Sequence, residues 1–142
     1  MKHLNTDIAI IGAGTAGMSA YRTVKASGLA CLLIEGGPYG TTCARVGCMP
    51  SKLLIAAAEA AHHARHTAEF GVHVQGEVQV NGREVMSRVR RERDRFVGFV
   101  LEAVQGFDPA DRLQGSARFL SNTELQVGNH TRVTASRIII AT

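Results

Sequence analysis

The sequence predicts an α/β fold in which a parallel sheet, built on a βαβ unit, is followed by a small C-terminal β meander. Three observations lead to this prediction. A short apolar run ends in a glycine-rich turn that opens a helical segment, and a second apolar run follows. Two longer segments in the middle of the chain have helical periodicity. The last third is instead rich in β-prone residues and turn signals.

The βαβ unit occupies the first 35 residues. Residues 7–11 form an apolar run that ends at a glycine, which is typical of a buried strand. Residues 18–27 have a helical pattern, and Gly28 is a natural helix stop. Residues 30–34 form a second buried strand that ends at Glu35. Two strands joined by a helix in this way are expected to be parallel, with a right-handed crossover.

The middle of the chain is expected to form two long helices. Pro50 stands where the first turn of a helix tolerates proline, so an alanine-rich helix is expected over residues 51–69. The second helix is expected to end at Asp108 and Pro109. It is indicated by apolar residues near helical spacing, namely Val85, Val89, Phe96, Val100, Ala103 and Phe107.

The last third of the chain is expected to form strands. Residues 117–119, 124–127 and 132–134 alternate or are β-prone, and Gly128 with Asn129 marks a turn. Residues 137–142 have the pattern of a further buried strand.

Composition and charge exclude several classes of protein. The 142 residues are enough for one domain with a core. No run approaches the roughly 18 apolar residues of a membrane span, and the N-terminus lacks a secretion signal, so a cytoplasmic protein without membrane contact is expected. Much of the net charge of +4 comes from residues 88–95, where acids interrupt the arginines and no aromatic residues are interleaved. This pattern favours a solvated helix face over a nucleic-acid site.

The glycine turn and the acid that follows it predict a dinucleotide site of the Rossmann-like type. Gly12 permits a tight turn, Gly14 lets the backbone approach a pyrophosphate, and Gly17 lets helix and strand pack closely. The N-terminus of the following helix offers N–H groups and a positive dipole end to phosphates. Glu35 is placed to accept hydrogen bonds from ribose hydroxyls. The pattern by itself leaves FAD and NAD open.

Residues 42–52, Thr-Cys-Ala-Arg-Val-Gly-Cys-Met-Pro-Ser-Lys, predict a redox-active cysteine pair. Cys43 and Cys48 can close a disulfide if the segment between them leads into a helix, which brings the Cα atoms within about 4.4–6.8 Å. Cys48 directly precedes the helix start expected at Pro50, where the helix dipole favours a thiolate. Lys52 adds positive charge one turn further on.

A zinc site is the alternative interpretation of these cysteines. Structural zinc usually needs four ligands, and the only other candidates nearby are His62, His63 and His66, at least two and a half turns from Cys48. Exposed histidines on a helix are the preferred interpretation, with no metal site. Cys31 lies in an apolar strand, where it is expected to be a small buried hydrophobe without chemistry.

Taken together, residues 12–17, Glu35 and residues 42–52 resemble the flavoprotein pyridine nucleotide–disulfide oxidoreductases. Residues 115–119 and 138–142 also match that family, so the resemblance covers essentially the whole chain. The cysteine motif is its most specific part. Pro50, Ser51 and Lys52 favour the lipoamide and mercuric-reductase branches over the glutathione-reductase branch.

The resemblance implies FAD as cofactor and NAD as the partner of the full-length enzyme. Cys48 would be the flavin-side sulfur and Cys43 the interchange thiol that reacts with a dithiol or disulfide substrate such as lipoamide. Lys52 would tune the flavin. The other implied cofactor-binding residues are Gly12, Gly14 and Gly17 at the pyrophosphate, Glu35 at the ribose, Gly40, Thr41 and Thr42 along the flavin, Ala117 at the adenine and Thr142 under the cofactor.

Two positions depart from the family pattern. Thr41 stands where members usually have a second glycine before Thr-Cys, and Arg45 stands where an asparagine is common. The resemblance also implies a homodimer and three further parts beyond residue 142: the rest of the FAD domain, an NAD domain and an interface domain carrying a catalytic His-Glu pair. Residues 1–142 are therefore expected to be the N-terminal segment of an incomplete FAD-binding domain, inactive by itself. A non-catalytic dinucleotide-binding or thiol-redox module is the alternative from another class.

Overall fold

The computed structural model describes residues 1–142 throughout. The chain divides into two compact units. The first comprises Met1–Thr41 and Val100–Thr142, and the second comprises Thr42–Phe99. None of the helices combines the length and the apolar character needed to span a membrane.

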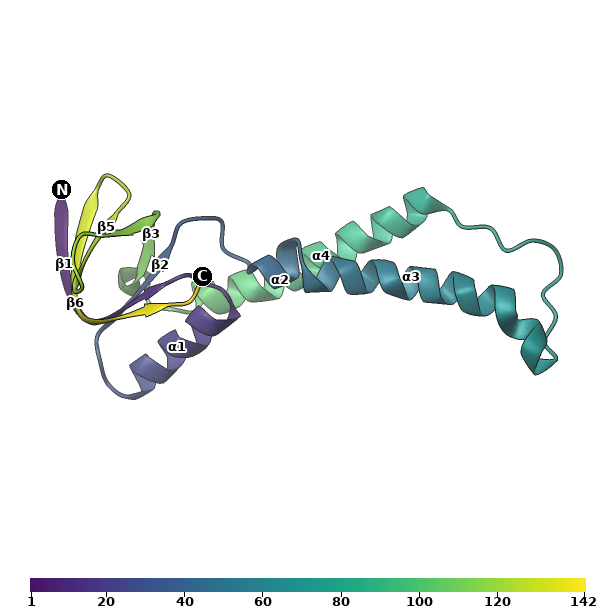
Figure 1. Cartoon of the computed structure of the whole chain (residues 1–142), viewed down its shortest axis with the longest axis horizontal. Helices are drawn as coiled ribbons and strands as arrows, with labels where there is room; N and C mark the ends of the chain where they lie inside the picture. Colours follow the sequence, from purple (N-terminus) through teal and green to yellow (C-terminus); the bar gives the residue numbers. More distant parts are fainter. The chain divides into compact units, whose positions relative to one another are not determined.

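The first unit contains a six-stranded sheet of order β3-β2-β1-β6-β5-β4 (Figure 1). The strands are β1 (Lys2–Ile11), β2 (Cys31–Glu35), β3 (Arg112–Gln114), β4 (Ala117–Phe119), β5 (Glu124–Val127) and β6 (Thr131–Ile140). β3, β2, β1 and β6 are parallel, while β4, β5 and β6 are antiparallel. The predicted α/β fold is confirmed. Its parallel part and its meander form one continuous sheet, because β6 pairs with β1 on one side and with β5 on the other.

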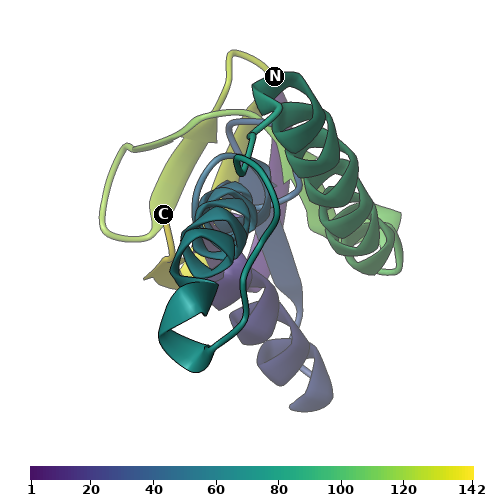
Figure 2. The same ribbon diagram turned by 90° about the vertical axis from the view of Figure 1, so that its right-hand side faces the viewer.

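Alternate residues of β1 and β2 pack into two different hydrophobic clusters, because successive side chains of a strand point to opposite faces. On one face, Ile10 and Leu33 pack with α1 (Thr15–Ala26) through Met18, Tyr21 and Val24, and with Val104 and Phe107. On the other face, Ala9, Leu32 and Ile34 pack with β5 and β6 through Leu125, Val127, Val133 and Ala135. The helix α1 runs along its face of the sheet at the bottom of Figure 2. This double burial explains why the end of β1, residues 8–11, and most of β2 are continuous apolar runs.

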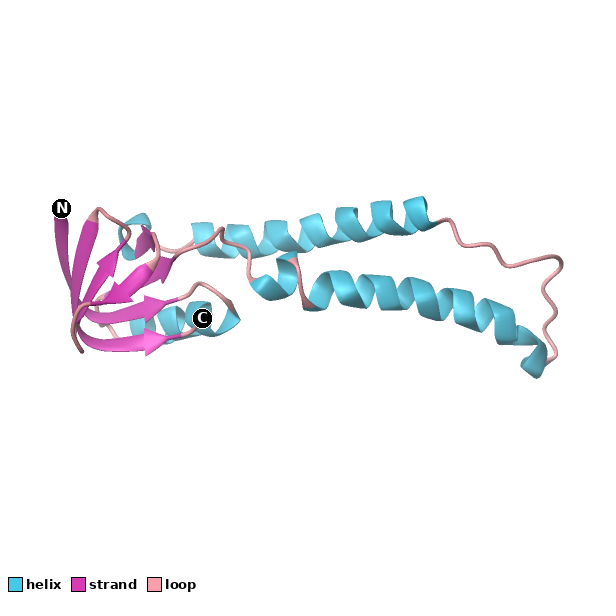
Figure 3. Ribbon diagram, turned by 45° about the horizontal axis from the view of Figure 1, so that its top comes forward, coloured by secondary structure: helices cyan, strands magenta, loops and turns pink.

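The second unit is helical. It contains α2 (Thr42–Arg45), α3 (Cys48–His66), the 3₁₀ turn η1 (Thr67–Phe70) and most of α4 (Gly82–Gln105). Figure 3 shows the stretch between η1 and α4 as a loop. No residue of α3 is buried. Arg88 of α4 donates a hydrogen bond from Nη1 to the carbonyl oxygen of Leu53 in α3 at 3.4 Å.

The first unit also holds a short connection after α4, the 3₁₀ turn η2 (Pro109–Asp111). Asp108 caps this turn, since its side chain accepts a hydrogen bond from the backbone N–H of Ala110 at 2.9 Å. The predicted end of the second long helix at Asp108 and Pro109 is therefore close to the observed end at Gln105.

Several boundaries differ from the sequence expectations. The helix expected from residue 51 begins at Cys48, because Gly47 serves as its N-cap and Pro50 occupies the third helical position, within the first turn. The strands expected at residues 132–134 and 137–142 form the single strand β6, because pairing with β1 extends along its whole length. Ile140 is 66% exposed rather than buried, since it lies at the strand end beyond both clusters. The short elements α2 and β3 have too few residues to show a period and were not expected.

Candidate functional site

The glycine turn after β1 combines one tight turn with one close packing contact. Gly12 has φ of +105°, and a Cβ there would overlap the carbonyl of Ala141. Gly17 is buried against β1, and a Cβ there would overlap the carbonyl oxygen of Gly12. Gly14 is different, because no atom lies within 4 Å of where its Cβ would be. The fold therefore requires glycine at positions 12 and 17, while the backbone at Gly14 is left open to a ligand.

The N-terminus of α1 is suited to an anion. Gly14 is its N-cap, no side chain caps the first turn, and no acidic residue lies in that turn. The first N–H groups of a helix have no partner inside the helix, and the dipole makes this end positive. A pyrophosphate fits these properties, because the phosphate oxygens accept from such N–H groups.

Glu35, at the end of β2, is held against the glycine turn by two backbone groups. Its Oε2 accepts a hydrogen bond from the N–H of Ala13 at 2.8 Å, and its Oε1 accepts one from the N–H of Gly37 at 2.7 Å. A carboxylate oxygen has more than one lone pair, so each oxygen can also accept from a ribose hydroxyl. The backbone N–H groups of Ala13 and Gly37 carry no sequence signal, and sequence reasoning did not include them.

The segment around Ala117 lies next to the loop that follows Glu35. Gly115 donates its N–H to the carbonyl oxygen of Glu35 at 2.8 Å, and Gln114 Nε2 donates to the carbonyl oxygen of Gly37 at 2.7 Å. Gln114 was not among the predicted site residues, and no sequence signal marks it. The tertiary structure thus brings the predicted adenine-side segment beside the predicted ribose-binding acid.

The chain end returns to the glycine turn. Ala141 donates its N–H to the carbonyl oxygen of Ile11 at 2.8 Å, which continues the pairing of β6 with β1. Thr142 follows directly and is exposed. Thr142 and Gly12, both predicted site residues, therefore lie next to each other at the carboxyl edge of the parallel strands.

The predicted cysteine pair belongs to the second unit. Cys43 lies in α2, and Cys48 is the first residue of α3. Both are free cysteines, and the Cys48 side chain lies near enough to Cys43 to affect the pKa of its thiol. The intervening turn is closed by the N–H of Val46, which donates to the carbonyl oxygen of Thr42 at 3.0 Å. The short helix α2 and the glycine before α3 thus bring two cysteines that are five positions apart close together.

The environment of Cys43 raises the pKa of its thiol. The largest cause is the hydrogen bond with the Cys48 side chain, followed by partial burial and by the charge of Cys48. The positive charge of Lys52 acts in the opposite direction and lowers this pKa. A raised pKa keeps Cys43 protonated near neutral pH, so its reaction as a nucleophile requires removal of this proton.

Residues 40 and 41 lead from the first unit into the cysteine segment. Gly40 is buried and has φ of +115°. Thr41 has φ of +57°, which makes it the only residue other than glycine in the left-handed region. This conformation explains why glycine is common there in the family that the sequence resembles, since a β-branched residue fits it poorly.

Cys31 is isolated from these groups. It is 1% exposed and packs in the cluster beneath α1. Burial raises the pKa of its thiol to about 11. A thiol of this kind is inert at neutral pH. No three His, Cys, Asp or Glu side chains of the chain are arranged to hold a metal ion.

Comparison with known proteins identifies the family. The model of the family described as pyridine nucleotide-disulphide oxidoreductase matches residues 6–142. The chain belongs to this family. Its members, dihydrolipoyl dehydrogenases among them, use FAD and NAD. The residues around Gly14, Glu35 and Cys48 are those that the sequence resemblance singled out.

Among the relatives of the chain in this family are several dihydrolipoyl dehydrogenases. The one from Mycoplasma pneumoniae is 31% identical over 139 residues, covering 98% of this chain and 30% of the relative. The one from Chlamydia trachomatis is 33% identical, covering 96% of this chain and 29% of the relative. A mercuric reductase from Streptomyces lividans is 43% identical over 68 residues, which is 48% of this chain and 14% of that protein. The chain thus spans about 30% of the length of these two dihydrolipoyl dehydrogenases.

A solved structure confirms the fold. The HOCl-induced flavoprotein disulfide reductase RclA from Escherichia coli superposes with a TM-score of 0.70 at 24% identity, over 96% of this chain and 28% of that one. The two chains therefore share the same fold over nearly the whole length of the present chain.

Proposed function

We propose that the chain is the N-terminal part of an NAD-linked FAD disulfide oxidoreductase of the dihydrolipoyl dehydrogenase type. The observation that carries this proposal is the nearness of Cys48, at the start of α3, to Cys43, whose pKa it raises. The same chain also has an uncapped glycine turn. The family match and the relatives named dihydrolipoyl dehydrogenase support it.

The proposed cofactor is FAD, held largely by the first unit. The N–H groups at the start of α1 bind the pyrophosphate beside Gly14, and the Glu35 carboxylate accepts from the ribose hydroxyls. We assign the adenine to the segment of Ala117, and the flavin end to Gly40, Thr41, Thr42, Lys52 and Thr142. When bound, FAD supplies the transfer of an electron pair between a nicotinamide and a thiol pair. The protein contributes binding and orientation.

The cysteine pair exchanges electrons with the substrate. In the oxidised chain a thiolate of the substrate dithiol attacks the Cys43 sulfur, which breaks the Cys43–Cys48 bond and leaves Cys48 as a thiolate. The second substrate thiolate then attacks the mixed disulfide, which releases the oxidised substrate and leaves Cys43 reduced. Two electrons pass from the dithiol to the cysteine pair, and the raised pKa of Cys43 favours the thiol form of this leaving group.

The remaining functions of the whole protein are also proposals. We assign residues 1–142 to the FAD-binding domain, and a nicotinamide site, a homodimer and a base that deprotonates Cys43 to other parts of the protein. Lipoamide is the proposed substrate class, because the dihydrolipoyl dehydrogenases match nearly the whole chain. The second candidate activity is the reduction of mercuric ions, because 68 residues of the chain are 43% identical to a mercuric reductase.

The nucleotide half of the proposal is tested by titrating FAD into the purified chain and following flavin fluorescence. We expect wild type to quench the flavin and Gly14→Ala to fold normally but bind at least about tenfold more weakly, since its methyl group fills only the space left for the pyrophosphate. Equal affinities of wild type and Gly14→Ala would refute the assignment of Gly14, and absence of binding by wild type would refute that of the FAD site.

The thiol half is tested by mass spectrometry after mild oxidation. Wild type is expected to form an internal disulfide between Cys43 and Cys48 and to be reduced again by dihydrolipoamide. The Cys43→Ser variant is expected to form no internal disulfide. The control is Cys31→Ala, which removes the buried thiol and is expected to form the same disulfide as wild type. A disulfide that includes Cys31 would refute the assignment of the pair.

A further inference from the structure

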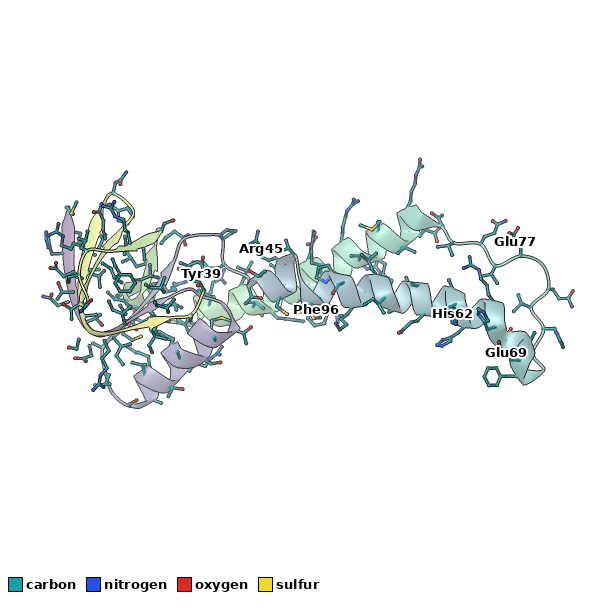
Figure 4. The ribbon with its side chains drawn as sticks, viewed as in Figure 1. Tyr39, Arg45, His62, Glu69, Glu77 and Phe96 are labelled. Carbon is teal, nitrogen blue, oxygen red and sulfur yellow. The ribbon has the colours of Figure 1, made fainter.

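A pair of histidines near the C-terminal end of α3 has no part in the proposed redox function. His62 and His66 are four positions apart, so they lie on the same face of the helix. Their rings stack with centroids 4.1 Å apart and planes inclined by 29°. Both side chains are exposed. His62 is labelled close to Glu69 of the following 3₁₀ turn in Figure 4.

The hydrogen bond made by His66 fixes which of its ring nitrogens is free. His66 Nδ1 lies 2.7 Å from the carbonyl oxygen of His62. A carbonyl oxygen only accepts, so Nδ1 carries the hydrogen and Nε2 of the neutral ring keeps its lone pair. Histidines that bind metals typically donate the other ring N–H to a carbonyl or carboxylate in this way, which orients the ring.

The spacing of the two rings suits one shared ion. A transition metal lies about 2.0–2.1 Å from each imidazole nitrogen, so two nitrogens on one ion are about 3–4 Å apart. The ring centroids are 4.1 Å apart, so both imidazoles can bind one ion once the exposed side chains rotate their free nitrogens toward it.

The surroundings also favour a cation. His62, His66 and Glu69 are among the side chains that line one open pocket of about 390 Å³. The C-terminal end of a helix is the negative end of its dipole. Arg65, the nearest basic residue in sequence, lines a different pocket. Because no three potential ligands are arranged around one point, the remaining coordination positions are left to water.

We propose that His62 and His66 form an open two-histidine site for a late first-row divalent cation such as Zn²⁺. Imidazole nitrogen is a preferred ligand of Zn²⁺, Cu²⁺ and Ni²⁺. The site is separate from the cysteine pair, since 18 residues of helix at 1.5 Å each place His66 about 27 Å along α3 from Cys48.

The test is a calorimetric titration of the full chain with Zn²⁺ after the accessible thiols have been blocked with iodoacetamide. Blocking prevents Cys43 and Cys48 from acting as ligands. We expect one Zn²⁺ per chain, with affinity at least about tenfold weaker in His62→Ala and in His66→Ala, since even outer-shell changes cost about 10–100-fold. The matched control is His63→Ala, which lies next to the pair in sequence and is expected to keep the wild-type affinity.

A second measurement does not depend on the variants. In wild type, the imidazole C–H resonances of His62 and His66 are expected to shift together as Zn²⁺ is added, ahead of those of His3, His73 and His130. Equal affinity in wild type and His66→Ala, a loss in His63→Ala as large as in His62→Ala, or Zn²⁺-induced shifts confined to other histidines would each overturn the proposal.

Discussion

The carboxylate of Glu35 accepts a hydrogen bond at 2.8 Å from the backbone N–H of Ala13, a residue 22 positions earlier in the chain. The same carboxylate accepts from the N–H of Gly37 at 2.7 Å. One side chain at the end of β2 therefore fixes both the glycine turn and the loop that follows the strand. This arrangement gives Glu35 a role in the fold in addition to its proposed role at the ribose.

The first prediction concerns this carboxylate. Glu35→Gln replaces one acceptor oxygen by an amide NH₂, which cannot accept from a backbone N–H. We expect the free energy of unfolding to fall by about 1–3 kcal/mol, as for the loss of a hydrogen bond to a charged group. Urea denaturation measures this change. The control is Glu102→Gln on the exposed surface of α4, and a fall in stability no larger than in this control would contradict the prediction.

The second prediction concerns Thr41. Its φ of +57° costs about 1–2 kcal/mol for a residue with a Cβ. Glycine avoids this strain, but it loses more chain entropy on folding, which offsets about 0.5–1 kcal/mol of the gain. Thr41→Gly is therefore expected to stabilise the chain by about 0.5–1 kcal/mol. Thr42→Gly, one position further in the helix α2, is expected to destabilise it by about 0.3–0.5 kcal/mol, because glycine is a poorer helix former than threonine. Thermal denaturation of both variants tests the opposite signs, and a destabilised Thr41→Gly would refute the strain.

The third prediction concerns the thiol of Cys43. Cys48→Ala removes the side chain that is the largest cause of the raised Cys43 pKa, so this pKa is expected to fall. Lys52→Gln removes the positive charge that lowers it, so here the pKa is expected to rise. The rate of alkylation of Cys43 as a function of pH measures both shifts, with mass spectrometry of the labelled peptide to identify the site. Unchanged midpoints in both variants would show that neither neighbour acts on Cys43.

The fourth prediction concerns the pH dependence of stability. Tyr21 donates to Asp111 Oδ2 at 2.7 Å, and Lys25 Nζ lies 2.8 Å from the same oxygen. Burial and the bond to Asp111 raise the Tyr21 pKa above its ordinary value of 10.0, so the folded chain holds this proton more tightly than the unfolded chain. The resulting stabilisation is complete below the unfolded pKa and is lost as pH rises through the folded pKa.

Tyr21→Phe separates these contributions. At neutral pH we expect a loss of about 0.5–1.5 kcal/mol for the missing hydrogen bond. Above about pH 10, the stability of wild type is expected to fall more steeply with pH than that of Tyr21→Phe. The pKa values of Lys25 and Cys31 are also raised, and both groups lose stabilisation in the same direction in both proteins. The difference between the two pH profiles therefore measures Tyr21 together with its charge interaction with Lys25. Parallel profiles would contradict this role. Urea unfolding at several pH values provides the measurement.

Much of the fold follows from local patterns in the sequence. The strands around Ile10 and Leu33 are unbroken apolar runs because both of their faces are buried, and α1 follows the glycine turn as expected. The sequence also predicted the close packing at Gly17 and the nearness of Cys43 to Cys48, because each depends on residues that are near in sequence.

Other features depend on pairing between distant segments, which has no local period. β3 has three residues and exists through its pairing with β2, and β6 is one strand because β1 pairs along its full length. The amino-acid sequence determined the residue types at the glycine turn, the acid and the cysteine pair. Only the tertiary structure decided that Glu35 bonds to Ala13, that residues 115–117 lie beside residues 35–37, and that Thr41 is left-handed, since backbone groups of every residue can make such contacts and nothing in their side chains reveals which ones do.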